Sequence, residues 1–150
     1  MKKIMMVGKV GCGKTTLSQR LMGEKICYKK TQSIEVLGTD IVDTPGEYLE
    51  RKSFYNALIV TAAEADVILL LLAADDEQNA FSPRMNSLFC GKPVIGVITK
   101  TDLCGDPEKI RLCQEILQMA GAAETYSVGL NGDGSLEILR NAIENIEMQV

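Results

Sequence analysis

Apolar and polar residues alternate along the chain in a pattern that predicts strands separated by helices. Three short segments, residues 2–7, 66–74 and 93–98, are largely apolar, which is typical of parallel strands buried on both faces. Residues 33–43 alternate on either side of Gly38-Thr39 and predict a β-hairpin with a two-residue turn. Residues 125–128 predict the last strand.

Several segments between and after these strands carry apolar residues at helical spacing. The apolar positions are Leu17 and Leu21; Phe54, Leu58 and Ala62; Ile110, Cys113, Leu117 and Ala120; and Leu136, Leu139, Ile143 and Ile146. Ser82-Pro83 predicts the start of a short helix, whereas Asp106-Pro107 and Gly121 predict the start and stop of a longer one. The alternation predicts an α/β fold: a mostly parallel six-stranded sheet with one antiparallel strand and helices on both faces. We expect residues 1–150 to form a single domain.

Composition narrows the class of protein. A hydrophobic content of 46% and a charged content of 24% are those of a soluble globular protein. The longest apolar run has eight residues, too few for a membrane span, and the first strand begins too early to leave room for a signal peptide. The five cysteines, without a C-x-x-C pair or any histidine, predict reduced thiols in a cytoplasmic protein. They are Cys12, Cys27, Cys90, Cys104 and Cys113.

Charge is distributed unevenly along the chain. Residues 1–30 carry eight Lys/Arg and the single acid Glu24, a local charge of +7 that leaves −11 for the remaining 120 residues. We interpret the basic segment as the flank of a polyphosphate site. Nucleic acid is not the expected partner, because the acidic remainder would repel its backbone. Solvated lysines without a binding role are the alternative interpretation.

Residues 8–15, GKVGCGKT, fit the spacing G-x-x-x-x-G-K-[ST] of a phosphate-binding loop. Glycines at positions 8, 11 and 13 allow a tight turn in which backbone N–H groups and a helix N-terminus face one anion. Lys14 is expected to reach the β- and γ-phosphates, and the Thr15 hydroxyl to bind Mg²⁺. A glycine-rich turn that binds nothing is the alternative, which the Lys-Thr pair disfavours. The predicted loop comprises Gly8, Lys9, Val10, Gly11, Cys12, Gly13, Lys14, Thr15 and Thr16.

A second motif, D-x-x-G, consists of Asp43 at the end of an apolar strand and Gly46 after it. An acid at this place can hold Mg²⁺ through water, and the glycine N–H can bind the terminal phosphate. Alone, the motif would indicate an acidic turn. Because it follows a phosphate loop and closes a strand, we interpret it as part of the same site.

A third motif, Thr99-Lys100-Thr101-Asp102, closes another apolar strand and concerns the base. A carboxylate at Asp102 can accept hydrogen bonds from the N1–H and N2–H₂ groups of guanine, whereas adenine lacks this pair of donors. The stem of Lys100 can lie along the plane of the base. The motif therefore favours GTP and GDP, with ATP as the alternative nucleotide. Ser127, at the end of the last strand, resembles the final base-contacting loop of GTPases, and the resemblance implies that Ser127 and Val128 contact the base as well.

The chain resembles a small Ras-like P-loop GTPase domain in the order of five segments, GKVGCGKTT, KKTQSIE, DTPGEY, ITKTD and YSVG. The forms KTQSIE and DTPGEY are similar to the EutP/PduV family of ethanolamine- and propanediol-utilisation proteins. The resemblance implies a cytoplasmic bacterial protein encoded with catabolic enzymes that are often housed in microcompartments, so the shell or those enzymes are the implied partners. It also implies that Thr31 is the switch residue that closes on Mg²⁺ and the terminal phosphate. A surface residue before a strand is the alternative for Thr31.

Two residues depart from the Ras-like pattern. Glu47 follows Gly46 where the best-known switches have Gln, and an ionised carboxylate places negative charge near the γ-phosphate. Val10 stands where many small GTPases have Gly, and its branched side chain would crowd an arginine finger. Both departures predict slow hydrolysis and no conventional activating partner.

The predicted function is Mg²⁺-dependent binding and slow hydrolysis of GTP by a switch or accessory protein of ethanolamine- or propanediol-type catabolism. Lys14, Thr31, Gly46 and Glu47 are the candidate catalytic residues, and Thr15, Thr31 and Asp43 the candidate metal ligands. Two alternatives keep the same nucleotide site. One is a kinase that transfers the γ-phosphate of ATP or GTP to a small carboxylate such as acetate. The other is a localisation or scaffold protein with little turnover.

Overall fold

The chain folds around one open sheet of six strands in the order β2-β3-β1-β4-β5-β6. This computed structural model describes residues 3–8, 17, 35–37, 41–43, 55–74, 85–89, 91–101, 106–129 and 135–144. The strands are β1 (Ile4–Gly8), β2 (Glu35–Leu37), β3 (Ile41–Asp43), β4 (Val67–Ala73), β5 (Val94–Thr99) and β6 (Glu124–Ser127). Neighbouring strands are parallel except for β2 and β3. The predicted α/β fold with one antiparallel strand is confirmed.

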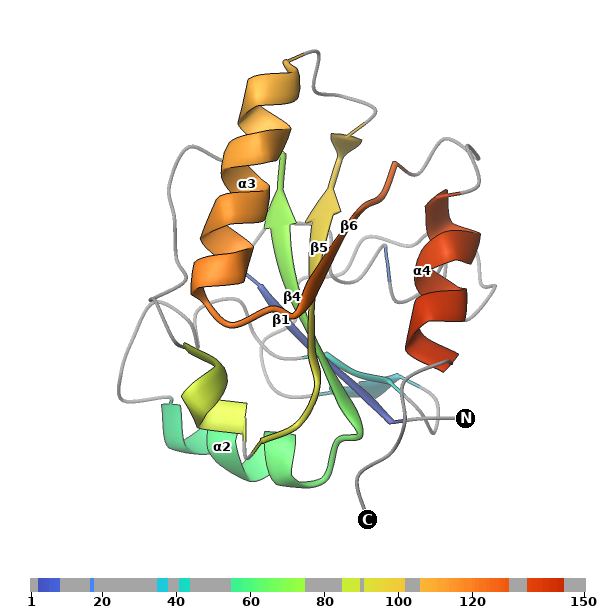
Figure 1. Ribbon diagram of the computed structural model, residues 1–150. Helices are drawn as coiled ribbons and strands as arrows, with labels where there is room; N and C mark the ends of the chain where they lie inside the picture. Colours follow the sequence, from blue (N-terminus) through green and yellow to red (C-terminus); the bar gives the residue numbers. More distant parts are fainter. Residues whose placement is uncertain are drawn as a thin grey trace.

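Helices cover both faces of this sheet, as the alternating pattern predicts (Figure 1). On one face lie α2 and α3, together with a short 3₁₀ helix, η3, and on the other lies α4. The helices are α2 (Tyr55–Ala63), η3 (Met85–Phe89), α3 (Pro107–Met119) and α4 (Ser135–Glu144).

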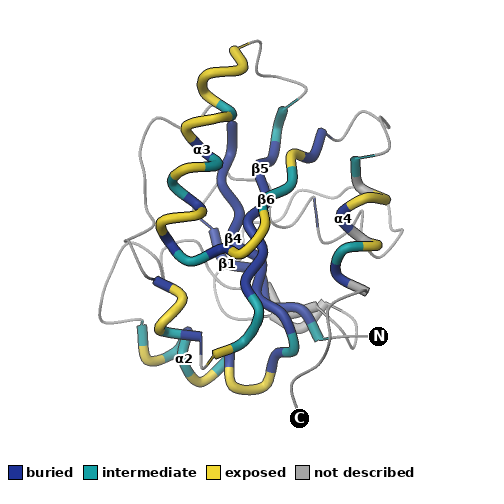
Figure 2. Tube along the Cα trace, in the orientation of Figure 1, coloured by how far each residue is buried: buried dark blue, intermediate teal, exposed yellow. Residues whose placement is uncertain are grey.

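The central strand β4 is buried along its whole length and divides the core into two clusters (Figure 2). Because successive side chains of a strand point to opposite faces, Leu70 packs with α2, η3 and α3, whereas Leu69 and Leu71 pack with α4 and Leu17. Leu17 is helical and fully buried, as its place after the phosphate loop predicts. An uninterrupted apolar run is therefore the correct signal for a strand covered on both faces.

Helix α3 begins and ends at the residues that the sequence indicates. The Asp106 carboxylate accepts a hydrogen bond of 3.0 Å from the N–H of Glu108, and Pro107 occupies the first turn. At the other end Gly121 has φ +110°, and its N–H donates to the Gln118 carbonyl at 3.1 Å. The N–H of Ala122 donates to the Leu117 carbonyl at 3.0 Å, which completes a Schellman stop.

Gly121→Ala is expected to lower the free energy of unfolding by about 1–3 kcal/mol. A Cβ atom at this position would lie 2.2 Å from Cγ of Asn86, in addition to the strain of the positive φ. Gly91→Ala is the matched control, because Gly91 also has positive φ (+75°) but an added Cβ would meet nothing within 4 Å. Urea unfolding monitored by circular dichroism measures both variants. If both variants lose the same free energy of unfolding, the close packing of η3 against the end of α3 contributes nothing to the effect of Gly121→Ala.

Gly96 lets α3 pack closely on the sheet. A Cβ atom on this β5 residue would lie 2.9 Å from Cβ of Leu117 and 3.1 Å from Cγ2 of Thr125. Leu117 and Cys113 of α3 are buried, and Ile110 is half-buried at the margin of the same cluster. The small residue in β5 therefore sets how near α3 comes to β5.

Some element boundaries differ from the sequence-based expectations. The hairpin register pairs Leu37 with Ile41, so three residues separate the paired positions and the prediction of a two-residue turn is wrong. The last strand begins one residue earlier, at Glu124. The short helix predicted after Ser82-Pro83 is observed as the 3₁₀ helix η3, Met85–Phe89. Leu58, Ala62, Leu139 and Ile143 are buried as expected. The positions of Leu21, Phe54 and Ile146, and the side chain of Leu136, lie outside the described residues.

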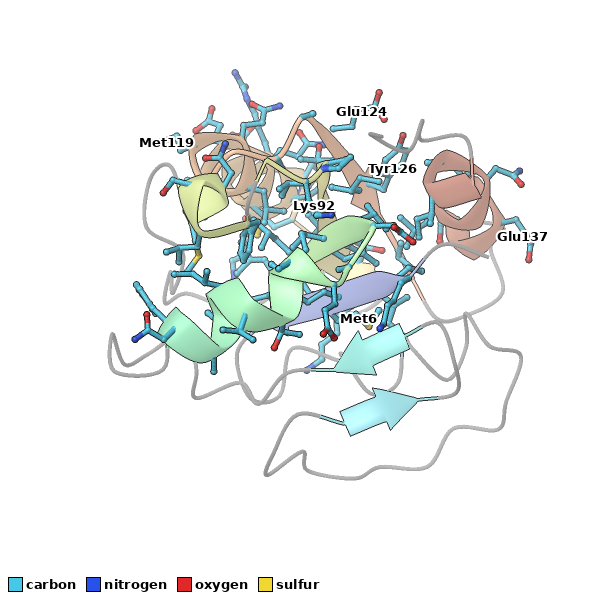
Figure 3. All side chains as sticks on the ribbon, turned by 90° about the horizontal axis from the view of Figure 1, so that it is seen from below. Met6, Lys92, Met119, Glu124, Tyr126 and Glu137 are labelled. Atoms are coloured by element: carbon cyan, nitrogen blue, oxygen red, sulfur yellow. The ribbon has the colours of Figure 1, made fainter. Side chains whose placement is uncertain are left out.

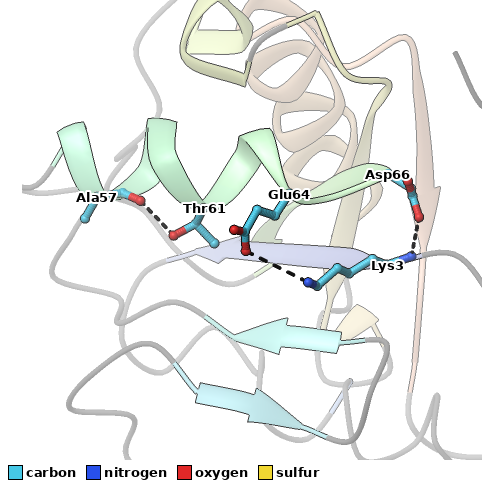
Figure 4. A network of polar contacts seen from close by, with 5 residues as sticks. All are labelled: Lys3, Ala57, Thr61, Glu64 and Asp66. Carbon is cyan, nitrogen blue, oxygen red and sulfur yellow. Dashed lines mark hydrogen bonds and ion pairs between the residues drawn. The ribbon is translucent and has the colours of Figure 1, made fainter. Parts of the chain in front are cut away.

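The starts of β1 and β4 are held together at the amino end of the sheet (Figure 4). The N–H of Lys3 donates to the Asp66 carboxylate at 2.8 Å, and the N–H of Asp66 donates to the Lys3 carbonyl at 2.7 Å. The Lys3 ammonium also lies 4.0 Å from the Glu64 carboxylate, but 77% of the Glu64 side chain is exposed, so this ion pair contributes little. The two backbone-directed bonds fix where β1 begins, and β1 leads to Gly8.

Candidate nucleotide-binding site

Four strands end at or beside the residues where the sequence motifs begin. β1 ends at Gly8, β3 at Asp43, β5 at Thr99 and β6 at Ser127. These strands are parallel, so their carboxyl ends lie along the same edge of the sheet. Ligands of open α/β sheets bind outside this edge. The topology therefore places the first residues of the three motifs, Gly8, Asp43 and Thr99, and the Ser127-Val128 segment along one edge of the sheet.

The predicted phosphate-binding loop begins where β1 ends. Gly8 is buried and lies opposite Leu71 of β4. Leu17, which follows the phosphate-loop motif, is helical and packs in the same cluster as Met6. The motif is therefore flanked by a strand and by a helical residue, which is the context it requires. Its remaining members, Lys9, Val10, Gly11, Cys12, Gly13, Lys14, Thr15 and Thr16, lie outside the described residues.

Asp43 is the last residue of β3, the strand that pairs with β1. Its backbone lies opposite Met6 of β1 on one side and Glu35 of β2 on the other. The D-x-x-G motif thus begins on the strand next to the one that enters the phosphate loop. Thr31, Gly46 and Glu47 lie outside the described residues.

The motif that is predicted to contact the base begins at the end of β5. The Thr99 side chain is buried, with 3% exposed, and the Thr99 carbonyl accepts a 2.8 Å hydrogen bond from the N–H of Ala74. Lys100 then has φ 59°, the left-handed conformation that costs a residue with a side chain about 1 kcal/mol. This left-handed conformation ends the extended path of β5 directly after Thr99. Asp102 lies outside the described residues.

The end of β6 lies beside the end of β5. Ser127 is paired with Ile98, and the N–H of Val128 donates to the Ile98 carbonyl at 2.8 Å. Val128 is fully buried, whereas Ser127 is exposed. The structure thus brings Thr99, Lys100, Ser127 and Val128 together, as the sequence predicts.

Sequence reasoning missed Ser135, the first residue of α4. The Gly129 N–H donates to Oγ of Ser135 at 3.2 Å, and the Ser135 hydroxyl donates to the Gly129 carbonyl at 3.4 Å. A serine at the start of a predicted helix is a typical cap signal. That signal gives no indication of the contact with Gly129, six residues earlier.

Another polar pair lies on β6, as Figure 3 shows for Glu124 and Tyr126. The Tyr126 hydroxyl donates a hydrogen bond to the Glu124 carboxylate. This hydrogen bond, with smaller contributions from burial and the Glu124 charge, raises the pKa of Tyr126. Neither residue belongs to the predicted site.

The predicted metal ligands are oxygen atoms contributed by three separate segments. Asp43 is placed through its backbone only, and Thr15 and Thr31 lie outside the described residues. Within the part of the chain that the structure describes, no cluster of three or more His, Cys, Asp or Glu side chains is suited to a metal ion. The described helices include none long and apolar enough to cross a membrane.

A solved structure with the same arrangement defines the class of fold. Era from Aquifex aeolicus, in a variant bound to GDP and aluminium fluoride, matches 100% of this chain with a TM-score of 0.69 and 22% sequence identity. The match covers 59% of the Era chain. The fold is therefore that of an α/β P-loop GTPase.

The particular family follows from the sequence. Residues 1–145 match the family PduV-EutP, described as "Ethanolamine utilisation - propanediol utilisation", and the chain belongs to this family. It is 45% identical over 126 residues to the propanediol utilization protein PduV of Citrobacter freundii, spanning 84% of this chain and 82% of PduV. It is 38% identical over 103 residues to the probable acetate kinase EutP of Escherichia coli K12, spanning 69% of this chain and 65% of EutP. Family and fold together indicate nucleotide binding in ethanolamine or propanediol utilisation.

Proposed function

We propose that this chain binds GTP in preference to ATP, requires Mg²⁺, and hydrolyses GTP slowly as a switch or accessory protein of ethanolamine- or propanediol-type catabolism. The observation that carries the proposal is the shared edge where β1, β3, β5 and β6 end, each at or beside a predicted nucleotide-contacting segment. In this proposal residues 1–150 act as one nucleotide-binding domain. Family membership supports the metabolic setting.

The phosphate half of the proposed site consists of residues 8–16, with Lys14 neutralising the β- and γ-phosphates. Thr15, Thr31 and Asp43 fit Mg²⁺, because hydroxyl and carboxylate oxygens are the ligands that this ion prefers. When bound, Mg²⁺ offsets the charge of the phosphate oxygens. The N–H of Gly46 binds the terminal phosphate.

The base half consists of Asp102 with the ends of β5 and β6. Thr99 and Lys100 set the path of the chain into Asp102, whose carboxylate accepts from guanine. Ser127 and Val128 contact the base from the neighbouring strand. Hydrolysis is an in-line attack of water on the γ-phosphorus, with the bond to the β–γ bridging oxygen breaking as GDP leaves.

A second function is favoured by the similarity to the Escherichia coli relative named probable acetate kinase. In that reaction an acetate oxygen attacks the γ-phosphorus in place of water. The bond to the β–γ bridging oxygen breaks, and acetyl phosphate and a nucleoside diphosphate leave. The residues that bind the nucleotide are the same in both reactions, and only the acceptor of the γ-phosphate differs. We place either activity in the cytoplasm, beside catabolic enzymes or a microcompartment shell.

Binding and product analysis test these proposals together. The titration uses GTP, GDP, ATP and ADP with metal-free and Mg²⁺-loaded protein, and we expect the tightest triphosphate binding for Mg²⁺-GTP. Phosphate release without acetate supports the slow GTPase, and acetate-dependent acetyl phosphate supports the kinase. Binding without either product supports a scaffold. Absence of purine nucleotide binding by the folded protein would contradict all three.

Glu47→Gln is expected to raise the single-turnover rate of GTP hydrolysis modestly. The amide has nearly the same volume, donates a hydrogen bond, and removes a negative charge beside the γ-phosphate. If Glu47 is instead a general base, the rate falls by about a hundredfold or more. In the acetate kinase, acetyl phosphate formation falls while nucleotide affinity stays level. An unchanged rate with and without acetate would exclude Glu47 from the chemistry.

A further inference from the structure

The hydroxyl of Ser135 connects the end of β6 to the start of α4. It accepts a hydrogen bond from the Gly129 N–H at 3.2 Å and donates to the Gly129 carbonyl at 3.4 Å. One side-chain atom therefore serves both polar groups of a single buried residue. Only a group that both donates and accepts can make this pair of contacts.

Both ends of this connection are anchored in the core. Val128 is fully buried, and its N–H is bonded to Ile98 of β5. On α4, Leu139 and Ile143 are buried in the same apolar cluster as Val128, and the helix lies beside the sheet in Figure 1. The Ser135 hydroxyl thus joins two fixed elements, so its loss would release the backbone N–H and carbonyl of Gly129 without removing either anchor.

The direction of the two hydrogen bonds distinguishes them from an ordinary helix cap. A capping hydroxyl accepts from an N–H two or three residues later in its own helix. The two bonds to Gly129 run six residues backwards, to the residue that directly follows Ser127 and Val128. The Gly129 N–H belongs to the peptide group that Gly129 shares with Val128, so rotation of this group would displace the Val128 carbonyl.

We propose that Ser135 is a positioning residue that holds the Ser127-Val128 segment in place for the nucleotide base. The inference rests on the proposed nucleotide function and extends it to a residue outside the motifs. Ser135 does not touch the base. It fixes the neighbouring peptide, so its loss should weaken guanine recognition more than phosphate binding.

Ser135→Thr and Ser135→Val form the matched pair for the test. Both residues are β-branched and similar in helix propensity, and they differ in the hydroxyl group. We expect Ser135→Thr to retain the GDP affinity of the wild type. Ser135→Val should raise the Kd for Mg²⁺-GDP by about three- to tenfold, the usual effect of one or two lost neutral hydrogen bonds. The Kd for Mg²⁺-ADP should change less, so the preference for GDP over ADP falls.

Isothermal titration of both nucleotides, with thermal unfolding of the nucleotide-free proteins, gives the result. Asn141→Ala, at an exposed position of α4, is the control and should leave the GDP to ADP preference unchanged. Equal weakening of GDP and ADP by Ser135→Val would mean a purely structural role and overturn the inference. So would unchanged affinity for both, or failure of Ser135→Thr to retain GDP binding. Wild-type protein that binds neither nucleotide, or both equally, would instead overturn the proposed guanine preference, and this inference with it.

Discussion

Lys14→Ala is expected to abolish measurable binding of Mg²⁺-GTP while the protein stays folded. The proposed loop places the ammonium against the β- and γ-phosphates, where water is largely excluded. Truncating one member of such a charge pair costs about 3 kcal/mol or more, which is over a hundredfold in Kd. A lysine contributes little to an apolar core, so the unfolding temperature without nucleotide should change little. Titration with a slowly hydrolysed GTP analogue measures the affinity.

Lys92→Ala is the matched control for this substitution. Lys92 is half-buried and precedes β5, so it lies at the amino end of a strand whose carboxyl end forms the candidate site (Figure 3). The same charge is removed, but at the opposite edge of the sheet. GTP affinity should stay within about twofold of wild type, because the charge lies at the edge of the sheet opposite the candidate site and is screened by salt. Tight Mg²⁺-GTP binding by folded Lys14→Ala would contradict the phosphate-loop assignment.

The sequence was most informative where a local pattern determines the structure by itself. The apolar run of residues 66–74 predicted β4, which spans Val67–Ala73, because a strand covered on both faces needs apolar residues at every position. Asp106 and Gly121 marked the limits of α3, because caps depend on chemistry within one helical turn. These features require no information from distant parts of the chain.

The prediction of a two-residue hairpin turn was wrong because the alternation of apolar and polar residues alone does not determine the strand register. A two-residue turn would pair Leu37 with Asp40, whereas the observed register pairs Leu37 with Ile41 and Val36 with Val42. Apolar residues thus lie opposite apolar residues, which stabilises adjacent strands. The pairing of apolar residues across the two strands, rather than the residues at the turn, indicates the correct register.

The positions of the strand ends at which the motifs begin were predictable, because each motif follows an apolar run. Topology then places these strand ends along one edge, because parallel strands share a carboxyl edge. The left-handed Lys100 was not predictable, since lysine rarely adopts that conformation without support from the surrounding structure. Ser135 was missed for a related reason: its contact with Gly129 depends on how α4 packs beside β6.

Asp102→Asn is expected to weaken GTP binding by about a hundredfold or more, because two hydrogen bonds to a charged acceptor are lost. The amide can donate to the 2-oxo group of xanthine, so binding of xanthosine triphosphate should improve and the preference should reverse. Competition titrations with both nucleotides measure this reversal.

The control for that substitution lies four residues further on. Asp106→Asn removes the same charge, and asparagine caps a helix about as well as aspartate, so α3 should keep its start. Asp106 is exposed, and its substitution should leave the preference for GTP over xanthosine triphosphate unchanged. Folded Asp102→Asn that still prefers GTP to the wild-type extent would mean that residues 99–102 form a turn without a role in base recognition. Reversal in Asp102→Asn but not in Asp106→Asn would assign guanine recognition to the chain segment that follows the left-handed turn at Lys100.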